Sequence, residues 1–204
     1  MNNKSVQIPL NNDKTIDGKI YGSGNNAIIF SNMDTNVQEE WDPIVEVLEP
    51  EGYMILTYNY FDFNEKQHDT LEDVVLFTKN SGAKKIIIIG ASRGGVASLK
   101  VATRSVNDKS VIGVAAISAQ IEYEGTTFYS TEELRSIKIP KLLIDSELDG
   151  GAEDNRKMIK ILNDPKDLLF YKGDAHGTQI FENNRESLVK RLRDFISSVF
   201  ENSI

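Results

Sequence analysis

Apolar and polar positions alternate along the chain in two different periods. The segments 5–8 and 15–21 have short alternating patterns around the polar turn Asn11-Asn12-Asp13, which predicts an opening antiparallel pair of strands. Beyond residue 26, short apolar runs typical of strands take turns with amphipathic helical patterns. The runs fall at 27–30, 53–58, 84–90, 111–118, 141–145 and 168–171. The helical patterns fall near 37–49, 70–80, 94–105 and 152–162, and a last one ends the chain.

Two of these segments indicate how the layers are built. The run of isoleucines at 86–89 is apolar on both faces, as expected of a central parallel strand between two helix layers. The last helix has an apolar face at helical spacing, which predicts packing against a sheet. That face holds Leu188, Leu192, Phe195, Ile196 and Val199. We therefore expect a single doubly wound α/β domain over residues 1–204, with about eight mostly parallel strands and helices on both faces.

Composition narrows the classes of function. The net charge of −8 and the pI near 4.9 disfavour binding to nucleic acid. The absence of cysteine excludes disulfides, a thiolate nucleophile and cysteine-ligated metal sites. The first residues lack the apolar stretch of a secretory signal, and no segment is apolar enough to span a membrane. We expect a cytoplasmic protein that binds neither nucleic acid nor membrane.

A nucleophile motif follows the strand at 84–90. Gly90-Ala91-Ser92-Arg93-Gly94-Gly95 fits the pattern Gly-x-Ser-x-Gly between a buried strand and a helix. A sharp turn there brings neighbouring backbone close, and glycine on either side of the serine leaves room for it. A glycine-rich turn that serves packing alone, or one that cradles a phosphate, is the alternative. The spacing Gly-x-Gly-x-x-Gly of a dinucleotide site is absent.

A serine hydroxyl needs a neighbouring base, and the chain has two histidines. His176 follows the strand at 168–171, so it lies at the carboxyl end of the sheet, where ligands bind in such folds. His68 lies in the polar stretch 64–70, before a helix. We therefore expect His176 to be the base and His68 to be a solvated side chain.

A carboxylate should orient the histidine, and the order serine, acid, histidine is typical of one hydrolase class. The acids after the strand at 141–145 are Asp145, Glu147, Asp149 and Asp154. Asp149 is preferred because it lies in the turn beyond the strand, before Gly150 and Gly151. Asp145, nearer the strand, is the second choice.

These residues give the chain a resemblance to the α/β-hydrolase superfamily. It resembles most the small bacterial members without a large lid, grouped with dienelactone-hydrolase-like and esterase or thioesterase proteins. The matching segments are AIIFSNMD, Trp41, EGYMILTYNY, GASRGG, IPKLLIDSELDGG and KGDAHGTQIF. The resemblance implies an α/β-hydrolase fold with Ser92 as nucleophile, Asp149 as acid and His176 as base.

The resemblance has two departures. Many members have His-Gly after the third strand, whereas this chain has Ser31-Asn32-Met33-Asp34. We expect the backbone N–H of Arg93 as one oxyanion donor and that of Met33 or Asp34 as the other. The dienelactone hydrolases proper use a cysteine nucleophile, so their substrate is not carried over.

The chemistry implied is hydrolysis of a carboxylic ester or thioester through an acyl-enzyme, with a small-molecule acyl substrate and neither cofactor nor metal. An acyltransferase with the same triad, or a non-catalytic binding protein of the same fold, is the alternative. The segment 119–139 is too short for a helical cap, which predicts an open pocket. Tyr123, Phe128 and Tyr129 form either an apolar wall there or ordinary packing.

Overall fold

A mixed sheet of eight strands runs through the protein, whose computed structural model describes residues 1–61 and 66–203. The spatial order is β1-β2-β4-β3-β5-β6-β9-β10. β1 pairs antiparallel with β2, and β2 with β4, whereas every other neighbouring pair is parallel. The strands are β1 (Asn3–Pro9), β2 (Thr15–Tyr21), β3 (Asn26–Ser31), β4 (Met54–Tyr58), β5 (Lys85–Ala91), β6 (Val111–Ile117), β9 (Lys141–Ser146) and β10 (Lys166–Tyr171). The predicted opening hairpin and mostly parallel sheet are confirmed.

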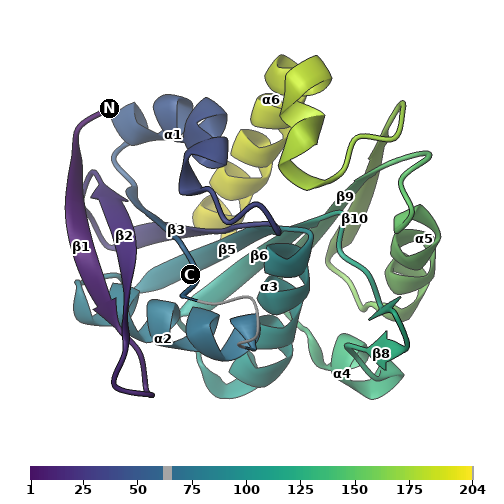
Figure 1. Ribbon diagram of the computed structural model, residues 1–204, viewed down its shortest axis with the longest axis horizontal. Helices are drawn as coiled ribbons and strands as arrows, with labels where there is room; N and C mark the ends of the chain where they lie inside the picture. Colours follow the sequence, from purple (N-terminus) through teal and green to yellow (C-terminus); the bar gives the residue numbers. More distant parts are fainter. Residues whose placement is uncertain (62–65, 204) are drawn as a thin grey trace.

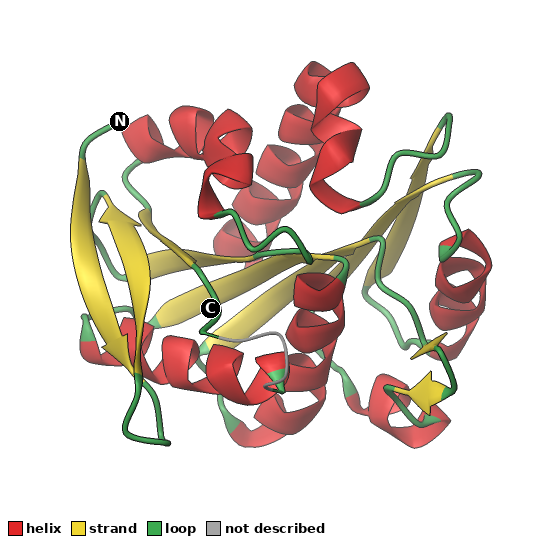
Figure 2. Cartoon of the chain, viewed as in Figure 1, coloured by secondary structure: helices red, strands yellow, loops and turns green. Residues whose placement is uncertain are grey.

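Helices cover both faces of the sheet (Figures 1 and 2). α1 (Asp42–Leu48) and α6 (Ile180–Asn202) pack on one face. α2 (Gln67–Asn80), α3 (Arg93–Arg104) and α5 (Ala152–Ile161) pack on the other. No helix in the described residues is both long and apolar enough to cross a membrane.

The isoleucines of β5 divide between the two layers as their pattern predicts. Ile87 and Ile89 join the cluster under α1 and α6, whereas Ile86 and Ile88 join the cluster on the side of α2 and α3. All four are fully buried, and each contributes about 2 kcal/mol relative to an exposed side chain. β5 is therefore the centre of the sheet, and the residue that follows it is held on a rigid support.

The predicted helix near 37–49 is broken into three pieces. A 3₁₀ turn at Gln38–Trp41 precedes α1, and a second 3₁₀ turn follows at Glu49–Glu51. Pro43 and Pro50 stand at the starts of the second and third pieces. Because proline lacks the N–H of a helix interior and clashes with the preceding turn, each begins a new piece.

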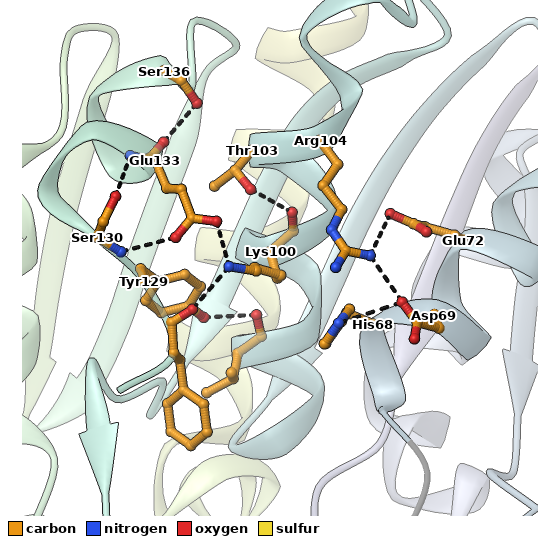
Figure 3. A network of polar contacts seen from close by, with 12 residues as sticks. His68, Asp69, Glu72, Lys100, Thr103, Arg104, Tyr129, Ser130, Glu133 and Ser136 are labelled. Carbon is orange, nitrogen blue, oxygen red and sulfur yellow. Dashed lines mark hydrogen bonds and ion pairs between the residues drawn. The ribbon is translucent and has the colours of Figure 1, made fainter. Parts of the chain in front are cut away.

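The segment 119–139 forms no cap. It makes a small hairpin of β7 (Glu122–Tyr123) and β8 (Thr126–Thr127), then α4 (Thr131–Ser136). Lys100 on α3 bonds the Phe128 carbonyl and pairs with Glu133 of α4 (Figure 3). The Tyr129 hydroxyl donates to the Val96 carbonyl, so this ring is a core residue.

Of the two alternatives for Tyr129, ordinary packing holds, because its ring fills the space between α3 and α4 and is 3% exposed. Phe128 packs against the same core, and Tyr123 is exposed on the hairpin.

Candidate active site

Ser92 lies in a tight turn between β5 and α3. Its φ of +50° and ψ of −116° fall in a region that L-residues rarely adopt, as expected of a serine held on a sharp elbow. The Ser92 N–H donates to the Ile117 carbonyl at 2.7 Å, and the Ser92 carbonyl accepts from Val96 at 2.9 Å. The turn is thus bonded to β6 on one side and to the first turn of α3 on the other.

The glycines around Ser92 are required by the packing of the turn. A Cβ on Gly90 would lie 2.1 Å from the Gly94 carbonyl oxygen, and one on Gly94 would lie 2.1 Å from that of Ser31. Both distances are far inside van der Waals contact. Glycine at these positions therefore lets the elbow close against itself and against the end of β3.

His176 bridges Ser92 and Asp149. Its Nε2 lies 2.7 Å from Ser92 Oγ, and its Nδ1 lies 2.9 Å from Asp149 Oδ2. The imidazole comes from the loop after β10 and the carboxylate from the loop after β9. The Leu148 N–H donates to the Gly173 carbonyl at 2.9 Å, which ties these two loops together. The structure therefore brings together the three side chains that the sequence singles out.

The electrostatics favour a basic histidine. The hydrogen bond with Asp149 raises the pKa of His176 above its usual value, against the effect of partial burial. Burial would raise the pKa of Asp149, but the hydrogen bonds with His176 and Asp145 hold it below its usual range. An anionic Asp149 thus faces an imidazole that accepts a proton readily.

The fold is shared with solved hydrolases. An esterase from Pyrococcus furiosus matches with a TM-score of 0.80 at 18% identity, over 97% of this chain and 91% of that one. This chain has the α/β-hydrolase fold. A dienelactone hydrolase from Anabaena variabilis matches with a TM-score of 0.80 at 16% identity, over 97% and 98% of the two chains. An esterase domain from Rhodothermus marinus matches with a TM-score of 0.78 at 16% identity, over 96% and 98%.

No protein-family model matches the sequence, and no curated protein does either. At these identities the likeness to solved structures establishes the α/β-hydrolase fold, and the resemblance inferred from the sequence motifs is confirmed at that level.

The loop after β3 lies beside the elbow of this α/β-hydrolase fold. Asn32 anchors it, because its buried amide donates to the Tyr58 carbonyl at 2.8 Å and accepts from Trp41 Nε1 at 3.0 Å. Met33 is buried, and its sulfur accepts from the Thr178 hydroxyl at 2.9 Å. Asn32 thus fixes this loop through its side chain.

Arg93 and Asp34 meet at the edge of the site. Arg93 Nε lies 2.9 Å from Asp34 Oδ1, and both side chains are partly exposed. The backbone N–H groups predicted to bind the oxyanion, those of Arg93 and of Met33 or Asp34, therefore belong to two segments that are in contact near Ser92. That these groups bind an oxyanion stays a prediction.

The other sequence candidates lie elsewhere. His68 lies at the start of α2 beside Asp69 (Figure 3), and residues 64–65 of its polar stretch lie outside the described residues. Glu147 is exposed. Asp154 accepts the Ile121 N–H at 2.9 Å, which holds the start of the hairpin segment.

Asp145 is buried directly behind Asp149. Its carboxylate accepts a hydrogen bond from the Ser118 hydroxyl. No sequence motif predicts this contact, because it depends on the ends of two strands meeting in space.

Proposed function

We propose that this chain is a serine hydrolase that cleaves a carboxylic ester or thioester. The observation that carries the proposal is the unbroken hydrogen-bonded path from Asp149 through His176 to Ser92, at 2.9 and 2.7 Å. Such a path activates a hydroxyl that is otherwise a weak nucleophile. Support also comes from matched structures named as esterases, a dienelactone hydrolase and a monoacylglycerol lipase.

The reaction follows from the roles of these groups. Ser92 Oγ attacks the acyl carbonyl carbon while its proton passes to His176 Nε2, and Asp149 stabilises the imidazolium. The backbone N–H groups of Arg93 and of Met33 or Asp34 bind the oxyanion, and loss of one such donor typically costs about 3 kcal/mol. Collapse of this intermediate expels the alcohol or thiol with the proton from His176. Water then attacks the acyl-enzyme and gives its proton to His176, and the carboxylic acid leaves as Ser92 regains a proton from His176.

The site favours small or surface-presented acyl groups. The His176 side chain is 31% exposed, so no part of residues 1–61 and 66–203 closes it off from solvent. The segment 119–139 packs against α3 and leaves the triad uncovered by a helical cap. An acyl-enzyme in this setting is open to water, which favours hydrolysis over transfer to a bulky acceptor.

Labelling with a fluorophosphonate probe tests the proposal without knowledge of the substrate. We expect the wild type to gain the mass of one probe adduct and Ser92→Ala to gain none, because the probe reacts with an activated serine. Intact mass measures the adduct, and circular dichroism establishes that both proteins are folded. Absence of an adduct on the folded wild type would contradict the proposal and favour the non-catalytic binding protein.

The pH dependence has a predicted sign. The base must be neutral to accept the Ser92 proton, and Asp149 raises the pKa of His176 above 6.5. We therefore expect kcat/KM for a model ester to rise with pH through a midpoint above 6.5. Asp149→Asn should move this midpoint to lower pH and reduce kcat by about 10⁴-fold.

The exposed Asp174, in the same loop as His176, gives a matched control for that experiment. Asp174→Asn removes a carboxylate that makes no contact with the imidazole among the described hydrogen bonds. We expect it to keep the midpoint and the rate of the wild type. An identical midpoint in Asp149→Asn and the wild type would argue against Asp149 as the partner of His176.

A further inference from the structure

Asp145 is a fully buried acid that the proposed reaction does not use. It lies near the end of β9, and its side chain is 0% exposed. A carboxylate removed from water is costly unless it is neutralised or well hydrogen-bonded. The hydrogen bonds that its carboxyl group accepts therefore decide whether an acid is tolerated at this position.

Three donors from different elements converge on the Asp145 carboxyl group. Its Oδ1 accepts from the Ser118 hydroxyl at 2.8 Å and from the Ser146 N–H at 2.9 Å. Its Oδ2 accepts from the Asn155 amide at 2.7 Å. β6, β9 and α5 are thus joined at one buried group.

The same network holds the backbone on both sides of His176. The Ser118 hydroxyl accepts the N–H of Gly177 at 2.9 Å. The Ser146 hydroxyl donates to the carbonyl of Ala175 at 2.6 Å. Ser118 adopts a φ of +51°, an uncommon conformation for serine, and one that the hydrogen bonds on either side of its hydroxyl help to hold.

Asp145 also lies close to Asp149, and two neighbouring carboxyl groups disfavour each other's ionisation. Burial raises the pKa of Asp145 to about 7, whereas that of Asp149 lies below its usual range. Asp145 is therefore the less acidic of the two. The titratable groups that face it are Asp149 and, beyond it, His176, since the Ser118, Ser146 and Asn155 side chains do not titrate.

We propose that Asp145 is a positioning residue of the triad, whose buried carboxyl group, through Ser118 and Ser146, fixes the backbone on both sides of His176. The inference rests on the proposed function and deepens it. Asp145 touches no substrate in this scheme. It keeps the imidazole in line with Ser92 and Asp149.

Two variants separate the charge of Asp145 from its hydrogen bonds. Asp145→Asn keeps the shape and an oxygen that accepts from Ser118 and Ser146, so we expect kcat within about threefold of the wild type. Asp145→Ala leaves Ser118 without its partner, so we expect kcat to fall about 30-fold or more, with KM nearly unchanged. Asp154→Asn, which alters another acid at the same edge of the sheet, is the control and should match the wild type.

An NMR titration of His176 gives a readout that needs no turnover. The protein has only two histidines, so His68→Ala assigns the signals. The hydrogen bond with Asp149 raises the pKa of His176, and that bond depends on where the loop holds the imidazole. We therefore expect a lower pKa for His176 in Asp145→Ala, whereas a residue that only supports the fold would leave it unchanged.

The outcomes distinguish this inference from the proposed function. Asp145→Ala with kcat within threefold of the wild type, or with the wild-type pKa of His176, would overturn the positioning role. A wild type that is never labelled at Ser92 would instead overturn the hydrolase, while the titration would still decide whether Asp145 acts on His176. If Asp145→Ala does not fold, the titration of Ser118→Ala, which lacks the link from Asp145 to Gly177, decides in its place.

Discussion

His176→Ala is expected to lower kcat for ester hydrolysis by about 10⁶-fold, and Ser92→Ala by a similar factor. The reason is that the imidazole, 2.7 Å from Ser92 Oγ, is the proposed acceptor of the hydroxyl proton, and neither group acts without the other. The double variant should therefore lose no more than either single variant. Steady-state rates with short-chain p-nitrophenyl esters measure all three proteins.

The second histidine provides the control for this series. His68 lies at the start of α2, beside Asp69 and away from the elbow, so His68→Ala should keep the wild-type rate. Additive losses in the double variant would mean that Ser92 and His176 act independently, and the proposed relay would be wrong.

Gly94→Ala is expected to cost about 3 kcal/mol or more of the free energy of unfolding and to remove the activity. Its Cβ would lie 2.1 Å from the Ser31 carbonyl oxygen and 2.6 Å from that of Asn32. Both contacts are with backbone, so no side-chain rotation relieves them. Separation of the elbow from the loop after β3 would also displace the predicted oxyanion donors.

Urea unfolding measures this loss, with Gly150→Ala as the matched variant. A Cβ on Gly150 meets nothing within 4 Å, so its stability should equal or slightly exceed that of the wild type. A free energy of unfolding for Gly94→Ala within about 0.5 kcal/mol of the wild type would show that the loop after β3 moves aside at little cost. That result would contradict the requirement for glycine at position 94.

Much of the fold follows from local sequence. The isoleucines of β5 alternate between two cores because the side-chain period of a strand is two, and the apolar face of α6 follows from the helical period. The elbow is also local, since strand, glycine, serine, glycine and helix are consecutive. The helix around α1 is divided at Pro43 and Pro50. These prolines predict the breaks, whereas the amphipathic pattern alone predicts one continuous helix.

The sequence by itself determined the layered α/β architecture, the turn that holds Ser92 and a short set of partners for it. Only the tertiary structure decided that Asp149 meets His176 while Asp145 lies behind it, and that Asn32 anchors the loop after β3. The physical reason is that periodicity and turn chemistry act over a few residues. The His176 to Ser92 contact spans 84 positions and depends on how the ends of separate strands align.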